Sequence, residues 1–289
     1  MIAVVLEQAL NGVQLGVTLF LLASGLTLVL GIMRLVNLAH GALYMVGAYI
    51  AFSIRASSGF FSLGIVVSAI ATGLVGAVVE RVLFRRLYAR GYLEQVIISF
   101  GVVMFLDELV RVLWGPLPLN APIPALLQFN VPLLPGLLYP AYRLAIIAVG
   151  LLISLLLYWL VSRSRLGMII RAGASDRAMV AALGINISDL YTFVFALGAV
   201  LAAVAGTMAG PIYTVQIGMG EPVLVQSLIA IVIGGIGSIR GAAIAAILVG
   251  ITDTVGRVFL PPGISQAFIY MMMASVLFWR PRGLFPANV

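Results

Sequence analysis

The sequence predicts an all-α fold, a polytopic bundle of about eight or nine helices that cross a lipid bilayer. Of 289 residues, 63% are hydrophobic and only 9% are charged, and the mean hydropathy is +1.21. A soluble domain is about 45–50% apolar and about 25% charged, so this much apolar surface requires an apolar solvent. No polar stretch is long enough to form a core of its own. We therefore expect a single transmembrane domain over residues 1–289.

Nine apolar runs approach the length of about 20 residues that crosses the hydrocarbon as a helix. They lie near residues 9–30, 36–54, 62–79, 96–114, 143–161, 190–210, 222–239, 242–260 and 265–279. The second run is interrupted by Asn37 and His40, and the ninth is short. Eight complete crossings with one re-entrant segment are therefore an alternative to nine crossings. Because no basic residue precedes the first run, we expect that run to be retained as a span and not removed as a secretory signal.

The arginines predict the orientation, because basic loops resist translocation. With the N-terminus in the periplasm and the C-terminus in the cytoplasm, the cytoplasmic side receives Arg34, Arg81, Arg85, Arg86, Arg90, Arg163, Arg165, Arg171, Arg177, Arg240, Arg280 and Arg282. The outer side receives Arg55, Arg111, Arg143 and Arg257. This distribution accounts for the net charge of +7 without nucleic acid, which we do not expect as a partner.

Two stretches between the apolar runs are candidate contact surfaces. The outer loop over residues 115–142 contains no charged residue and is rich in proline, so we expect irregular structure that caps the membrane interface or docks an extracytoplasmic partner. The cytoplasmic loop over residues 163–189 contains an alanine-rich helix. Ser175 or Asp176 is its expected N-cap, and Gly184 its expected stop. A helix of small residues outside the membrane buries little by itself, so another protein would receive it.

Two apolar runs share a charged motif. Asp107 and Arg111 lie four residues apart in the fourth run, and Asp253 and Arg257 lie four apart in the eighth, each followed by a proline. This spacing places both charges on one helical face, where they can pair. A carboxylate at membrane depth costs about 2.5–3.5 kcal/mol, which pairing partly offsets. The pairs would orient helices near the outer face or contact substrate, and the match suggests a parallel internal repeat four spans long.

The residues that could carry chemistry are few. There is no cysteine and one histidine, so we expect no metal site, and we find no catalytic constellation. There is also no lysine, which excludes a Walker-type nucleotide loop. Asn37, His40 and Gly41 form a polar break that could line a translocation path or cap a helix at the interface. The run Gly234, Gly235 and Gly237 is a second path candidate, although such glycines also allow close packing or a tight turn.

Five segments carry recognisable motifs: GLTLVLGIMRLVNLAHGALYMVGAYIA, ISFGVVMFLDELVRVLWGP, RAGASDRAMVAALGINI, IGGIGSIRGA and the terminal RPRGLF. Taken together, these segments resemble the permease subunits of branched-chain amino acid ABC importers. The resemblance extends over nearly the whole chain and is specific for the family. It is less specific for the substrate, because permeases for urea and short amides look similar.

The resemblance implies partners and a site. Such a permease forms the translocation path with a second, homologous permease in the inner membrane of a bacterium. Two cytoplasmic ATPases hydrolyse ATP, a periplasmic binding protein delivers substrate, and the permease itself needs no cofactor and is not an enzyme. The family's coupling segment, which contacts the ATPase, matches a helix over residues 171–184. The residues implied for that contact are Arg171, Asp176, Arg177, Ala181, Leu183 and Gly184.

The chain departs from the family pattern in two places. Arg85-Arg86-Leu87 replaces an arginine-proline-leucine order, and Arg240 stands where proline is common. Both departures leave the identity of the substrate less certain. An ion-coupled secondary transporter is the rival from another class. It would need acidic sites at membrane depth, for which Asp107, Glu108 and Asp253 are the candidates.

Overall fold

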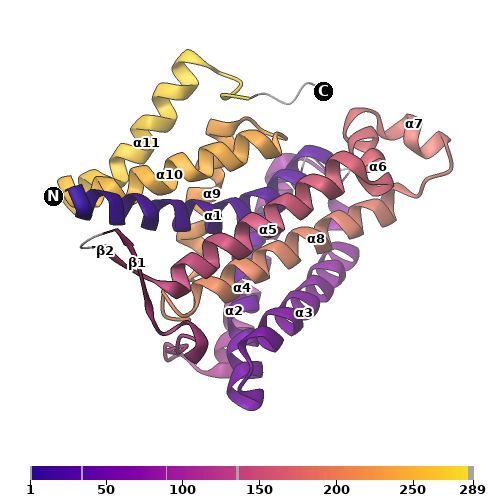
Figure 1. Ribbon diagram of the computed structural model, residues 1–289. Helices are drawn as coiled ribbons and strands as arrows, with labels where there is room; N and C mark the ends of the chain where they lie inside the picture. Colours follow the sequence, from indigo (N-terminus) through magenta and orange to yellow (C-terminus); the bar gives the residue numbers. More distant parts are fainter. Residues whose placement is uncertain (1, 34, 89, 135–136, 286–289) are drawn as a thin grey trace.

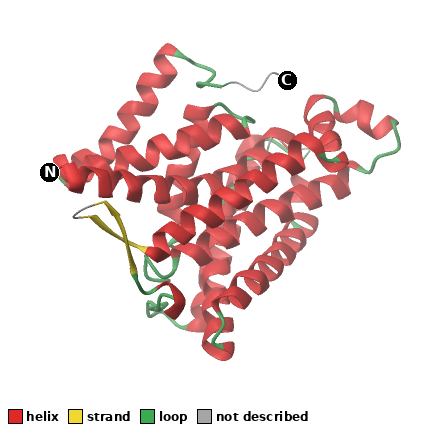
Figure 2. Ribbon diagram, in the orientation of Figure 1, coloured by secondary structure: helices red, strands yellow, loops and turns green. Residues whose placement is uncertain are grey.

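The computed structural model describes residues 2–33, 35–88, 90–134 and 137–285, and most of them are helical (Figures 1 and 2). Arg34 and Pro135, which the sequence analysis used, lie outside these ranges. The α-helices are α1 (Ile2–Met33), α2 (Ala39–Ser58), α3 (Phe61–Val82), α4 (Tyr92–Trp114), α5 (Ala141–Arg163), α6 (Arg165–Ser175), α7 (Arg177–Ala182), α8 (Ile187–Ala209), α9 (Gly220–Gly234), α10 (Ile239–Phe259) and α11 (Pro262–Trp279). Two 3₁₀ turns, η1 (Phe84–Leu87) and η2 (Ala125–Leu127), and two strands, β1 (Asn130–Leu134) and β2 (Leu137–Pro140), complete the described elements.

Each predicted span corresponds to one long helix, and five helices (α1, α3, α5, α8 and α10) are both long and apolar enough to cross a membrane. The protein is therefore an all-α polytopic membrane protein. The largest difference is in the seventh span, predicted over residues 222–239. Its helix, α9, has only 15 residues, a length of about 22 Å against a hydrocarbon core of about 30 Å. It ends because Gly235 adopts a φ of 102°, so the seventh span is short. The apolar stretch Ala267–Trp279 of α11 is short as well, as expected for the ninth run.

The helices divide into a central and a peripheral set. The apolar windows of α1 and α8 are 89% and 78% buried inside the protein, whereas those of α3 and α5 are 28% and 17% buried. Along α3, the exposed apolar side chains Ile70, Leu74 and Val78 recur every four residues. A soluble protein rarely exposes such a stripe, but in a bilayer it faces lipid tails. The bundle therefore has apolar side chains both in its interior and on its surface, which accounts for the 63% of hydrophobic residues in the sequence.

The central helices approach one another through small residues. Gly250 of α10 packs on α1 so closely that a Cβ atom added to it would lie 2.3 Å from the carbonyl oxygen of Gly12 and 2.5 Å from the amide nitrogen of Gly16. Polar pairs join other helices, as where the hydroxyls of Ser68 on α3 and Thr207 on α8 lie 2.9 Å apart. Close backbone contact and interhelical hydrogen bonds drive helix association in lipid, where burying apolar surface gains little.

The proline-rich loop is more regular than its sequence predicted. The strands β1 and β2 pair as an antiparallel hairpin, with Val131 opposite Tyr139, and a separate bridge joins Leu119 to Val215. Prolines are tolerated because a two-stranded ribbon has a free edge on each strand. The Tyr139 hydroxyl donates to Asn11 of α1 at 3.1 Å, so the hairpin is fixed to the bundle.

The bundle has two distinct ends. The N-terminus and the β1–β2 hairpin lie at one end, and α6 and α7 project from the other (Figure 1). We refer to these as the hairpin end and the α7 end. The carboxyl end of α10, with Asp253 and Arg257, lies at the hairpin end, because α10 runs antiparallel to α1.

Replacing Gly250 by valine should destabilise the protein by about 1–3 kcal/mol, because the added side chain collides with the α1 backbone. Thermal unfolding of the purified protein in detergent would show a lower melting temperature. Gly101→Ala on α4 is the control, since an added Cβ there meets nothing within 4 Å. Equal melting temperatures for the two variants would contradict the packing argument.

Candidate functional site

The segment predicted as one helix over residues 171–184 is two helices. Chain direction changes at Asp176, which ends α6 and begins α7 in an extended conformation. Its carboxylate accepts hydrogen bonds from the backbone N–H groups of Ala178 at 2.9 Å and Met179 at 3.0 Å. Asp176 is thus the N-cap of α7. A cap satisfies donors that the first turn of a helix leaves unpaired, and the same aspartate that starts α7 terminates α6.

The α7 helix ends at Ala182, and Gly184 follows it with a φ of 82°, a conformation that favours glycine. The surface of this short helix is open and partly apolar. Met179 is 60% exposed and Leu183 is 72% exposed, and Ala181 is exposed beside them. The exposed apolar side chains of α7 therefore have little cover from the rest of the described chain.

Arginines attach the segment to the bundle. Arg171 on α6 donates to the backbone carbonyl of Val161 at the end of α5. Arg177, the first residue of α7, donates to the hydroxyl of Tyr191 on α8 at 3.2 Å. The Tyr191 ring stands edge-on to Tyr88, with ring centroids 5.0 Å apart. α7 therefore contacts Tyr191 through Arg177, and Tyr191 in turn packs against Tyr88.

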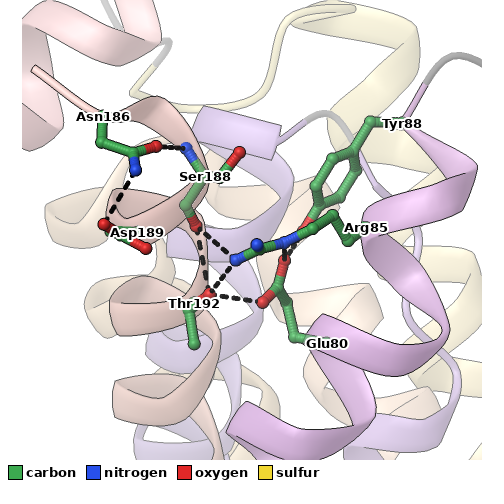
Figure 3. Close-up of polar contacts among 7 residues, drawn as sticks. All are labelled: Glu80, Arg85, Tyr88, Asn186, Ser188, Asp189 and Thr192. Carbon is green, nitrogen blue, oxygen red and sulfur yellow. Dashed lines mark hydrogen bonds and ion pairs between the residues drawn. The ribbon is translucent and has the colours of Figure 1, made fainter.

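These contacts end at a buried carboxylate, Glu80, near the end of α3 (Figure 3). The side chain is 0% exposed. It accepts from the Tyr88 hydroxyl and from the Thr192 hydroxyl at 2.5 Å, and the Arg85 Nε lies 3.8 Å away. Arg85 also donates to Thr192 at 3.0 Å. Burial, together with the hydrogen bond to Glu80, raises the pKa of the Tyr88 phenol, which keeps it a donor.

The Glu80 cluster joins α3, the turn after it and the first turns of α8. In the same region Asn186 caps α8 by accepting from the Ser188 amide at 3.0 Å, and its side-chain amide donates to Asp189 (Figure 3). Sequence reasoning missed Glu80. The available signal was a carboxylate at the end of an apolar run with an arginine five residues later. A spacing of five does not place two side chains on one face of a regular helix. Here the 3₁₀ turn η1 brings Arg85 back toward Glu80.

The first group of path candidates lies inside the bundle. Asn37 and His40 are each 1% exposed, and within the described residues neither Asn37 side-chain atom nor His40 Nε2 has a hydrogen-bond partner. A Cβ atom on Gly41 would lie 2.8 Å from the carbonyl oxygen of Gly220. The first turns of α2 and α9 therefore touch.

The second group surrounds the turn between α9 and α10. Gly234 packs against Gly241 of α10, where an added Cβ would come within 2.3 Å of its backbone. Gly235 and Gly237 have φ angles of 102° and 84°, which a tight turn requires. Gly237 lines a cavity of about 280 Å³ together with Arg171, so a path candidate and a coupling candidate meet there.

Only one of the two expected ion pairs is formed. Arg257 donates to Asp253 Oδ2 at 2.7 Å, and the Asp253 side chain is only 2% exposed. Arg111 instead lies 3.5 Å from Glu108, with both side chains more than half exposed, and no ion pair between Asp107 and Arg111 occurs among the described residues. The two motifs thus differ in local structure, and the internal repeat stays a prediction.

A cavity with a volume of about 810 Å³ lies at the hairpin end. Its wall is formed by α1, Tyr44 of α2, the loop over residues 212–219, the start of α9 and the end of α10. Asp253 and Arg257 line it, whereas the candidates from residues 37–41 and 234–237 are not among its lining residues. Within the described chain, Asp253 and Arg257 therefore border this cavity, whereas Asn37, His40 and Gly41 do not.

A bundle of long apolar helices with a cavity between them defines a polytopic membrane protein. Residues 8–277 match the family described as the branched-chain amino acid transport system permease component. The chain belongs to this family, and is therefore a transport subunit and not an enzyme.

Curated relatives agree. The chain is 33% identical to the high-affinity branched-chain amino acid transport system permease protein BraD of Pseudomonas aeruginosa, with 96% of this chain and 95% of the relative covered. It is 32% identical to the corresponding LivH protein of Escherichia coli, covering 96% and 94%. A probable LivH protein of Methanocaldococcus jannaschii is 25% identical, covering 92% and 88%. No solved structure matches the chain.

Replacing Glu80 by alanine should lower the free energy of unfolding by about 1–3 kcal/mol, because the donors around it lose a buried acceptor. Thermal unfolding in detergent would measure the loss. Glu94→Ala, at an exposed position in the first turn of α4, should change stability by less than about 0.5 kcal/mol. A Glu80 variant as stable as the Glu94 variant would contradict the anchoring role.

Proposed function

We propose that the chain is the permease subunit of an ATP-driven importer for branched-chain or related hydrophobic amino acids. The family match over residues 8–277 carries the proposal, supported by relatives that are named as high-affinity branched-chain amino acid permeases. The subunit works with a second homologous permease, two cytoplasmic ATPases and a periplasmic substrate-binding protein. It holds no cofactor, since ATP is hydrolysed by its partners.

The proposed orientation places the hairpin end in the periplasm and the α7 end in the cytoplasm of a bacterial inner membrane. The arginine distribution supports this orientation, because basic residues stay on the cytoplasmic side. At the hairpin end Arg55 donates to the outer loop, Arg143 donates to Asn11 and Arg257 lines the cavity. Arg171 and Arg177 lie on α6 and α7 at the other end. It also brings the 810 Å³ cavity to the side from which a binding protein delivers substrate. The nine helices that correspond to the predicted spans then belong to one transmembrane domain, and α9 crosses only part of the hydrocarbon.

The proposed coupling contact is α7. Its exposed Met179 and Leu183 offer an apolar surface to a groove of the ATPase, and Arg177, Ala181 and Gly184 flank that surface. Movement of α7 would reach α8 through the bond from Arg177 to Tyr191 and then α3 through the Glu80 cluster. Closure of the ATPase dimer would thereby reorient the central helices and alternate access to the cavity.

A permease for urea or short amides is the alternative within the family, and uptake of urea and acetamide in place of leucine would reveal it. The ion-coupled rival loses two of its three acidic candidates to arginine partners, Glu108 to Arg111 and Asp253 to Arg257. Leucine uptake that persists without ATP and collapses with an uncoupler would favour that rival.

Asp176→Ala should reduce leucine uptake in a strain that lacks its own importer. Loss of an N-cap costs about 0.5–2 kcal/mol, which shifts the folding equilibrium of α7 by roughly two- to thirtyfold. Asp176→Asn keeps a cap acceptor and should retain uptake. Undiminished uptake by the alanine variant, with normal recovery of the partner subunits, would count against α7 as the coupling contact.

Cysteine labelling tests the orientation, because the chain has no cysteine of its own. A membrane-impermeant maleimide added to intact spheroplasts should label Gln128→Cys in the outer loop and leave Ala178→Cys on α7 unlabelled until lysis. Both side chains are exposed, so accessibility alone does not separate them. The reverse pattern would invert the topology and remove α7 from the ATPase.

A further inference from the structure

The carboxylate of Asp253 is buried but only half satisfied. The residue is 1% exposed, and its Oδ2 pairs with Arg257 at 2.7 Å. Its Oδ1 has no hydrogen-bond partner among the described residues. A buried charged oxygen without a partner is costly. Glu108 and Arg111 form their pair while both are exposed, so neither pays the cost of a buried charge. A pair that only orients a helix therefore does not need a buried carboxylate with an unpaired oxygen.

The space beside Asp253 is suited to a small ligand. Asp253 and Arg257 line the cavity of about 810 Å³ at the hairpin end, within the range of about 300–1,000 Å³ typical of ligand pockets. Leu15 of α1, Val223 of α9 and Val258 of α10 contribute apolar surface to the same wall. The cavity therefore combines one charged corner with an apolar section of wall, and polar side chains such as Gln8, Gln216 and Gln226 line other parts of it.

The charged corner carries both signs. Arg257 lies one turn beyond Asp253 on the same face of α10, and its side chain is 59% exposed. One nitrogen is occupied by Asp253, while the exposed part of the guanidinium is free to meet an anion. A ligand with an ammonium and a carboxylate on one carbon could satisfy both residues at once.

We propose that Asp253 and Arg257 form a subsite for the zwitterionic head group of an amino acid. Asp253 accepts from the ammonium, Arg257 donates to the carboxylate, and the ligand's apolar side chain packs on Leu15, Val223 and Val258. This inference rests on the proposed function and adds to it a place where the substrate is held inside the permease. The ligand class follows from the paired charges and the apolar wall.

Binding to the complete permease–ATPase assembly in nanodiscs, without the binding protein, tests the subsite. The probe is radiolabelled L-leucine, displaced either by isoamylamine, which lacks the carboxylate, or by 4-methylpentanoate, which lacks the ammonium. Asp253→Asn should weaken leucine and isoamylamine by about tenfold or more, the scale of a charge-assisted hydrogen bond, and leave 4-methylpentanoate within about twofold. The control Glu108→Gln removes a carboxylate from the exposed pair and should change none of them.

Unchanged leucine affinity in Asp253→Asn, or equal weakening of both analogues, would overturn the subsite. If Asp253→Asn does not assemble, Val223→Trp is the second variant, because it fills the cavity without changing charge. Leucine binding retained by Val223→Trp overturns the proposal, and loss of leucine binding supports it. Transport by the wild-type assembly with its binding protein is measured alongside. A wild type that transports no branched-chain amino acid refutes the proposed function, and one that transports leucine without binding it refutes only the subsite.

Discussion

Close approach of helix backbones at small residues is the constraint on which this bundle depends. Lipid tails are as apolar as leucine, so helices gain little by hiding leucine from lipid, and association must come from tight packing and hydrogen bonds. Gly250 of α10 fits against α1 with no room for a Cβ atom. Gly41 and Gly220 do the same for α2 and α9. These contacts fix α1, α2, α9 and α10, which together form most of the cavity wall.

The bundle buries two carboxylates near its opposite ends and treats them differently. Glu80 receives donors from Tyr88 and Thr192 and lies beside Arg85, so it ties helices together. Asp253 receives one arginine and keeps an oxygen without a partner in the described chain. A carboxylate with an acceptor bond at each oxygen, as in Glu80, stabilises one arrangement of helices, whereas an unsatisfied oxygen beside a cavity favours a ligand. One carboxylate therefore has a structural role, and the other is a candidate for binding.

The α7 end combines rigidity with exposure. Asp176 caps α7 locally, and Arg177 links it to Tyr191, yet Met179 and Leu183 remain open. A short helix that is held firmly at its base and uncovered on its face can pass a force from a partner to the core. The resemblance implied this role for the segment, but the break at Asp176 and the contacts beneath α7 are properties of the folded chain.

The sequence by itself determined the membrane-spanning, all-helical class, the positions of the long helices and the family, because apolar runs and short motifs are local. It also narrowed the cap to Ser175 or Asp176 and placed Asp253 beside Arg257, since both features depend on neighbours within four residues. The tertiary structure decided that α9 is short, that the proline-rich loop contains a hairpin, and that Arg111 prefers Glu108 to Asp107. It alone brought Glu80 to Thr192 and Asp253 to a cavity. Those contacts join residues far apart in the chain, and only the packing of helices fixes such distances.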